Sequence, residues 1–216
     1  MNRPYVLVNC ATSADGKTAL PNRDQLRISS DEDIERMYKL RNEFDAVLVG
    51  IGAVLSDDPK LTVKEKYVKN PHQPLRIVLD SKCRTPKDSL VVNQTAKTYI
   101  ITVEKCGKKF KNNVEVIECA SDEEGLIDLE ELLDILYKRG IKTLMVEGGG
   151  TVIWSFLRLG LVDDLYVYIA PIIIGGKFTP TIADGPGIKS EDELISLKIA
   201  DIKKFGKGIL VHYKRL

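Results

Sequence analysis

Short apolar runs alternate with amphipathic segments along the first two-thirds of the chain. The runs are rich in β-branched residues and bounded by turn residues, which is typical of buried strands. They cover residues 5–11, 46–50, 76–80, 98–102, 114–117 and 143–147. The final strand-like segments, 164–169, 194–201 and 208–213, have no long helix between them. The pattern predicts an α/β fold with a mainly parallel sheet and antiparallel strands in its C-terminal part.

Helices are predicted between the strands. Ser29 and Glu32 have the spacing of a capping box, which predicts a helix from there to about residue 42. A leucine-rich amphipathic helix begins at Asp128 and ends at a glycine near residue 140. Two shorter helices follow the glycine turns at 50–52 and 148–150. No repeat or linker divides the chain, so we expect a single domain over residues 1–216.

Charge and hydropathy exclude several classes of protein. Lys and Arg number 32 and Asp and Glu 31, so the net charge of +1 argues against a generally basic nucleic-acid binder. No apolar run approaches the roughly 20 residues of a membrane span. Asp15 and Lys17 follow the first strand too closely for a signal peptide. We therefore expect a cytoplasmic protein that binds neither membrane nor nucleic acid.

The cysteine pattern favours free thiols over a metal site. The four cysteines are Cys10, Cys83, Cys106 and Cys119. None forms a C-x-x-C pair and the chain has only two histidines, His72 and His212, so no metal is expected. We interpret the cysteines as buried or incidental thiols in a reducing compartment. Neither histidine lies in a setting that indicates a catalytic group.

Glycine turns after two buried strands are the first candidate site. Gly148, Gly149, Gly150 and Thr151 lie between a strand and a helix, where free amides favour an anion such as a pyrophosphate. The alternative is a tight turn with no ligand. Residues 50–54 carry two of the three glycines of the dinucleotide-binding fingerprint, a weak indication by itself. In an open α/β sheet, ligands bind outside the carboxyl ends of such strands.

Polar residues beside the buried strands are the second set of candidates. Asp80, Ser81 and Lys82 follow the third strand, where an acid can hold a ribose and a hydroxyl with a cation can hold a 2′-phosphate; the alternative is a solvated turn. Asn9 lies in an apolar strand and needs hydrogen-bond partners, either structural or from a ligand. Glu147 ends a buried strand and is either a ligand acceptor or a solvated acid.

Taken in order, these segments resemble the reductase family of riboflavin biosynthesis, which is similar to dihydrofolate reductase in fold. The most specific motif is the Asp-Asp-Pro-Lys-Leu-Thr run at residues 57–62. The other matching segments are 13–17, 41–45, 50–56, 76–81, 147–150, 160–163, 168–171 and 175–176. The resemblance covers nearly the whole chain and is strongest toward stand-alone archaeal members.

The resemblance assigns residues to two ligands. Along NADPH it implies Ala53, Asp57, Asp80, Ser81, Lys82 and the turn of Gly148, Gly149, Gly150 and Thr151. Around the substrate it implies Asn9, Asp15, Ser29, Arg41, Leu61 and Glu147, with Arg27 near the site. Arg41 is the natural phosphate partner, although a solvated cation at a helix end is the alternative. No residue is assigned as a general acid.

The implied reaction is reduction of the ribosylamino side chain of a pyrimidine 5′-phosphate to the ribitylamino form, with NADPH as the cofactor. The archaeal likeness favours the diamino pyrimidinone, and the deaminated uracil form is the alternative. A pterin-type reductase and a non-catalytic NADPH-binding protein are further alternatives. The family also implies a homodimer. Ala53 replaces the usual threonine and Lys64 an arginine common in bacterial members, so one cofactor contact and one phosphate contact differ.

Overall fold

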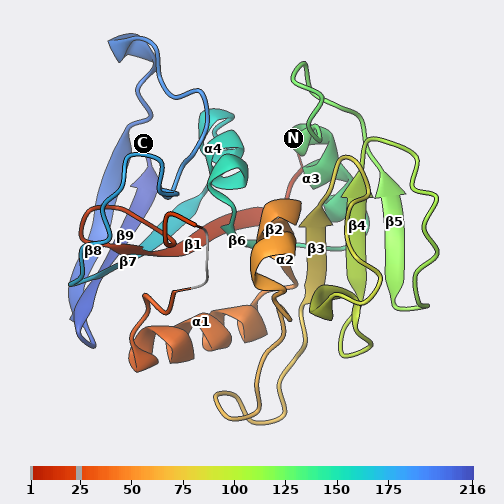
Figure 1. Cartoon of the computed structure of the whole chain (residues 1–216), viewed down its shortest axis with the longest axis horizontal. Coiled ribbons are helices and arrows are strands. Elements are labelled where there is room, and N and C mark those ends of the chain that lie inside the picture. Colours follow the sequence, from red (N-terminus) through yellow and green to blue (C-terminus); the bar gives the residue numbers. More distant parts are fainter. Residues whose placement is uncertain (1, 23–25) are drawn as a thin grey trace. The chain divides into compact units, whose positions relative to one another are not determined.

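The computed structural model describes residues 2–22 and 26–216 (Figure 1). Within these ranges the chain has nine strands and four α-helices. The strands are β1 (Tyr5–Ser13), β2 (Ala46–Gly50), β3 (Leu75–Leu79), β4 (Thr98–Thr102), β5 (Val114–Glu118), β6 (Thr143–Gly148), β7 (Asp164–Ala170), β8 (Leu197–Phe205) and β9 (Gly208–Arg215). The helices are α1 (Asp31–Glu43), α2 (Ile51–Asp57), α3 (Leu129–Lys138) and α4 (Gly150–Arg158).

Two compact parts make up the chain. The first comprises the chain up to Tyr5 together with residues 38–145, and the second comprises residues 6–37 and 146–216. Three elements, α1, β1 and β6, have residues in both parts. The expectation of one domain over residues 1–216 stays a prediction.

The first part is built on four parallel strands. They are ordered β5-β4-β3-β2, and β3, β4 and β5 lie side by side as the yellow and green arrows of Figure 1. β2 and β4 are buried along their whole length, as expected for parallel strands covered on both faces. Parallel pairing brings the carboxyl ends of β2 and β3 to one edge, because Gly50 pairs with Leu79. The turns that follow these two strands therefore start from neighbouring positions.

The second part combines one parallel pair with an antiparallel finish. β1 pairs in parallel with β7, and β7, β9 and β8 follow in antiparallel order. β8 runs from residue 197 to 205, so the predicted strand at 194–201 began too early and ended too soon. The chain from 191 to 193 forms a single 3-10 turn instead. The α/β class and the mixture of parallel and antiparallel strands are confirmed.

The helix ends follow the predicted chemistry with one shift. The Asp128 carboxylate accepts hydrogen bonds from the backbone N–H groups of Glu130 and Glu131 at 2.9 and 3.1 Å, which confirms it as the N-cap of α3. At α1 the predicted cap is one residue early, because the Ser30 carbonyl accepts the first helical hydrogen bond, from Ile34. Ser29 is thereby left to bond elsewhere.

Within the described ranges, every helix is too short or too polar to cross a bilayer.

Candidate active site

The turn from β2 into α2 leaves main chain uncovered. Gly50 ends β2 and caps α2 without a side chain, while Val54 packs into the core. A Cβ built on Gly52 would meet no atom within 4 Å, so internal packing does not require glycine there. Ala53 is half-buried and Asp57 is exposed on the same short helix. This turn is therefore open to a ligand that approaches the backbone closely.

The turn after β3 is organised by its own acid. Asp80 is fully buried, and its Oδ2 accepts hydrogen bonds from the N–H and Oγ1 of Thr85 at 2.6 and 2.7 Å. Arg84 places Nε 3.8 Å from the other carboxylate oxygen. Asp80 is therefore not a solvated acid, and its carboxylate is already engaged by the protein. It shapes the turn that carries Ser81 and Lys82. Lys82 is exposed on that turn, and Ser81 is half-buried.

The prediction of four free thiols is wrong for two of the cysteines. A disulfide joins Cys83, in the turn after β3, to Cys106, in the loop after β4. The Ser81 carbonyl also accepts hydrogen bonds from two N–H groups of that second loop, at 3.1 and 2.9 Å. Cys10 and Cys119 are free, and burial raises the pKa of each to about 12. The cysteine count therefore no longer supports a reducing compartment.

Backbone strain marks the Asp-Asp-Pro-Lys-Leu-Thr run. Asp58 and Leu61 have φ of 42° and 51°, a left-handed region that residues with a Cβ rarely adopt. Leu61 is nevertheless 2% exposed. Asp58 ends α2 and accepts a 2.6 Å hydrogen bond from the Leu90 N–H, which holds the bend. Strain of this kind concentrates at ligand-binding segments, which supports a functional interpretation of the run.

Arg41 lies against this run. Arg41 is only 9% exposed, and its Nη1 donates a 3.1 Å hydrogen bond to the Thr62 carbonyl. Its guanidinium carbon lies 5.4 Å from the centre of the Tyr38 ring, and Lys64 Nζ lies 5.4 Å from the same centre. The alternative of a solvated cation is therefore excluded. The first part of the chain brings two cations, Leu61 and an aromatic ring into one neighbourhood.

In the second part, the turn before α4 needs glycine at all three positions, and Gly148 needs it because of its φ of 150°. Gly149 adopts φ of 83°, which disfavours any side chain. A Cβ on Gly150 would lie 2.5 Å from the Asp184 carboxylate, so a neighbouring loop excludes a side chain there. A Cβ on Gly148 would meet nothing within 4 Å. Thr151 is exposed in the first turn of α4. The turn needs glycine for its shape, and Gly149 is its exposed position while Gly148 is buried.

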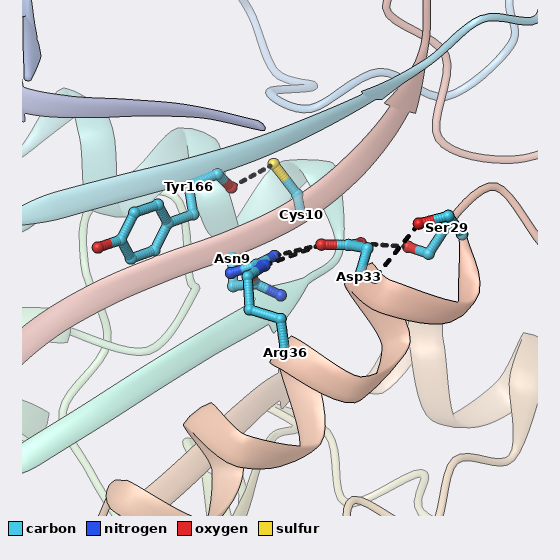
Figure 2. Close-up of polar contacts among 7 residues, drawn as sticks. Asn9, Cys10, Ser29, Asp33, Arg36 and Tyr166 are labelled. Carbon is cyan, nitrogen blue, oxygen red and sulfur yellow. Dashed lines mark hydrogen bonds and ion pairs between the residues drawn. The ribbon is translucent and has the colours of Figure 1, made fainter. Parts of the chain in front are cut away.

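Asn9 finds a structural partner on α1 (Figure 2). Arg36 Nη2 donates a 2.6 Å hydrogen bond to Asn9 Oδ1, and Nε and Nη2 both donate to Asp33 Oδ1 at 2.9 and 2.7 Å. Ser29 Oγ donates to the other Asp33 oxygen at 2.6 Å. Arg36 also lies over the Tyr166 ring, 5.5 Å from its centre. Asn9 and Ser29 are therefore joined by two residues that sequence reasoning missed.

The remaining substrate-side candidates differ in their surroundings. Asp15 accepts hydrogen bonds from Ser13 Oγ at 2.6 Å and from the N–H groups of Ile174 and Gly175 at 3.1 and 2.7 Å. These bonds, that of Ser13 first, lower the pKa of Asp15 to about 2. Asp15 thus ties its loop to residues 174–175 as a carboxylate. Glu147 is half-buried on β6, directly before the glycine turn.

The histidines lie in structural settings. His212 on β9 pairs with Asp164 on β7 and packs against the Tyr166 ring at 4.4 Å. His72 donates its backbone N–H to Asn42 in an exposed loop. In the part of the chain that the structure describes, no three His, Cys, Asp or Glu side chains cluster as metal ligands would.

A model of the RibD C-terminal domain family matches residues 4–211 of the chain. The chain belongs to this family. Its members include the 2,5-diamino-6-ribosylamino-4(3H)-pyrimidinone 5′-phosphate reductase of Archaeoglobus fulgidus, 42% identical over 97% of both chains. The Methanothermobacter thermautotrophicus protein of that name is 39% identical over 98% of both. The resemblance found in the sequence is confirmed.

The relatives named RibD are longer than this chain. The chain is 36% identical to the Actinobacillus pleuropneumoniae riboflavin biosynthesis protein RibD but spans only 57% of it. Among solved structures, the bifunctional deaminase and 5-amino-6-(5-phosphoribosylamino)uracil reductase of Thermotoga maritima matches with a TM-score of 0.84 at 26% identity. That match covers 99% of this chain and 57% of the other. The shared fold is that of RibD reductases.

Sequence reasoning missed four residues that organise these neighbourhoods: Asp33, Arg36, Tyr38 and Asp184. Asp33 and Arg36 are three apart on α1, a spacing typical of paired side chains on a helix, so the pair was open to prediction. Tyr38 and Asp184 offered no comparable local pattern, because each acts on residues brought close by tertiary folding.

Proposed function

We propose that this protein reduces the ribosylamino side chain of 2,5-diamino-6-ribosylamino-4(3H)-pyrimidinone 5′-phosphate to the ribitylamino form in riboflavin biosynthesis, with NADPH as the reductant. The observation that carries the proposal is the similarity to the archaeal reductases over the full length of both chains. The strained run at 57–62 and the buried Arg41 beside it support a ligand site in the segment that carries the most specific motif.

The residues present fit a reduced nicotinamide cofactor. In the first part, main chain is exposed at Gly52, where a dinucleotide can approach. In the second part, the first turn of α4 offers free N–H groups to a pyrophosphate. The cofactor residues we propose are Ala53, Asp57, Asp80, Ser81, Lys82, Gly148, Gly149, Gly150 and Thr151. Asp80 contributes by shaping its turn, since its carboxylate is engaged by Thr85. When bound, the nicotinamide supplies the hydride for C1′.

The chain's own residues bind and orient the substrate. Arg41 pairs with phosphate oxygens, and the exposed ammonium of Lys64 over the same aromatic ring adds a second positive charge. Leu61 offers an apolar contact. Asn9, Asp15, Ser29 and Glu147 meet the polar groups of the ribose and the pyrimidine. Orientation of this kind accelerates hydride transfer without a protein nucleophile.

One assay tests the function directly. Purified protein with NADPH is given the diamino substrate and the deaminated substrate side by side, and loss of NADPH absorbance is recorded. We expect faster reduction of the diamino form. The Thermotoga maritima relative is named for the deaminated substrate, so that substrate is the second candidate. NADPH binding without oxidation by either pyrimidine would instead indicate a non-catalytic binding protein.

Cofactor choice gives a first prediction. Lys82→Ala with Arg84→Ala should raise the Kd for NADPH about ten- to a hundredfold, since a charged hydrogen bond contributes about 1.5–3 kcal/mol. The Kd for NADH should change little, because NADH lacks the 2′-phosphate. Fluorescence titration measures both constants. Lys87→Ala, an exposed cation nearby, is the matched control. A preference for NADPH that survives the double substitution would move the contact elsewhere.

The α4 turn gives a second prediction. Gly149→Val would strain a backbone at φ of 83°, so a charge at exposed Thr151 is the cleaner probe. Thr151→Asp should leave stability unchanged or slightly higher, because an anion suits a helix N-terminus. It should weaken NADPH binding at least about fivefold, since like charges about 4 Å apart repel by about 1–4 kcal/mol. Thr151→Asn keeps the shape without the charge and serves as the control. Equal affinity in the two variants would remove α4 from the cofactor site.

We extend the proposal to a cytoplasmic homodimer, as the family resemblance implies. Sedimentation equilibrium of the purified chain tests the dimer, and cell fractionation tests the compartment.

A further inference from the structure

The Asn9 amide has its orientation fixed by chemistry. A guanidinium can only donate hydrogen bonds, so the Asn9 atom that lies 2.6 Å from Arg36 Nη2 must be the oxygen. If the amide were flipped, the Asn9 NH2 group would face an N–H group of Arg36, and no hydrogen bond could form. Asn9 is 7% exposed, so water cannot readily replace the lost bond. In the part of the chain that the structure describes, the Asn9 amide nitrogen makes no hydrogen bond.

Arg36 is itself held in place. Two of its N–H groups grip one Asp33 oxygen, and the Asp33 and Arg36 side chains are only 3% and 14% exposed. The face of the guanidinium lies over the Tyr166 ring. Figure 2 shows the result, with Arg36 reaching from α1 to Asn9 on β1 while Ser29 closes the other side of Asp33. A long, flexible side chain is thereby confined to one geometry.

This confinement is costly. Arg36 Nη1 is buried and has no hydrogen-bond partner among the described residues. A buried donor without a partner destabilises the folded state, because it has lost its hydrogen bond to water. An apolar pair at positions 33 and 36 would avoid that cost, because buried ion pairs often stabilise no better than apolar replacements. A buried donor without a partner in a native structure therefore needs an explanation other than stability.

We propose that Arg36, held by Asp33, is a positioning residue that fixes Asn9 as an obligate hydrogen-bond donor toward an acceptor oxygen or nitrogen of the pyrimidine substrate. The Ser29 hydroxyl donates its proton to Asp33 in the same network. Toward a ligand, the Ser29 oxygen can therefore only accept a hydrogen bond. The inference rests on the proposed function, because it deepens the role of two substrate-side residues.

Asn9→Asp separates a donor role from a structural one. The carboxylate still accepts from Arg36, so the protein should fold, but it can no longer donate to the substrate. We expect kcat/KM to fall by about two- to tenfold, mostly through KM, because one hydrogen bond contributes about 0.5–1.5 kcal/mol. Asn9→Ala should lose as much. Full activity of Asn9→Asp would overturn the donor role.

Removing the clamp tests whether Arg36 acts through Asn9. Arg36→Met should raise KM for the substrate about tenfold and leave the NADPH Kd unchanged, with Arg36→Lys recovering part of the loss. Asp33→Asn combined with Arg36→Met avoids an unpaired buried carboxylate, so a folded variant is available. In an Asn9→Ala background, Arg36→Met should change kcat/KM less than twofold. Lys39→Met, exposed on the same helix, is the control.

The outcomes are distinct. If the wild type reduces neither pyrimidine, the proposed function falls and this inference falls with it. If the wild type is active and the folded Arg36 variants keep their KM, only the inference falls. Effects of Arg36→Met and Asn9→Ala that multiply independently would also overturn it, because the arginine would then act by another route.

Discussion

Arg41→Ala should raise KM for the phosphorylated substrate about ten- to a hundredfold, since a charged hydrogen bond to phosphate contributes about 1.5–3 kcal/mol. The guanidinium fork matches two phosphate oxygens, and the Tyr38 ring beside it limits the orientations the side chain can take. kcat should fall as well if phosphate binding aligns C1′ for hydride transfer. Steady-state kinetics with saturating NADPH measure both constants, and the Kd for NADPH should barely change.

A dephosphorylated substrate makes this test specific. The wild type should prefer the phosphorylated form strongly, and Arg41→Ala should lose most of that preference. Arg41→Lys should restore only part of it, because an ammonium cannot contact two oxygens in one plane. Lys39→Ala removes an exposed cation from the same helix and should leave the preference intact. If Arg41→Ala retains it, the buried arginine has a structural role, including its bond to the Thr62 carbonyl, and the phosphate lies elsewhere.

The order of strands and helices could be predicted because local patterns determine it. The Asp128 cap and the leucine face of α3 act within a few residues, and the structure confirms both. β8 was misplaced because its exposed side chains give no hydrophobic period to mark its ends. Its position is set instead by pairing with β9, a contact that becomes visible only in the folded chain.

The sequence predicted which residue types form the candidate site, but the structure corrected how several of them are bonded. Asp80 was recognised as an acid at a strand end, yet its buried bonds to Thr85 depend on how the following turn folds back. The Cys83–Cys106 disulfide joins loops 23 residues apart, and no spacing rule marks such a pair. Gly150 is required by Asp184, which lies 34 positions later in the chain. The last two corrections come from contacts that are distant in sequence, and the first depends on the fold of a local turn.

Arg76→Met should destabilise the protein by about 3 kcal/mol or more, because it removes a buried guanidinium that bonds four carbonyl groups at once. Arg76 is 0% exposed in the middle of the first part, and burial lowers its pKa to about 10. Its guanidinium donates to the carbonyls of Lys60, Leu90, Asn93 and Ala96 and to Asn93 Oδ1, at 2.5–3.4 Å. Urea unfolding followed by circular dichroism measures the loss.

Methionine is the informative replacement because it keeps most of the side-chain volume, so the change reports lost hydrogen bonds and not a cavity. Asn113 still donates to the Asn93 and Ala96 carbonyls, which limits the loss of stability. The substitution therefore affects the Lys60 carbonyl most. Since Lys60 precedes the strained Leu61, the folded fraction of Arg76→Met should also show a raised KM for the substrate. Lys87→Ala, an exposed change in the same part, should shift stability by less than about 0.5 kcal/mol. If Arg76→Met lost no more stability than Lys87→Ala, water would have replaced the guanidinium. Arg76 would then not hold the run at residues 57–62.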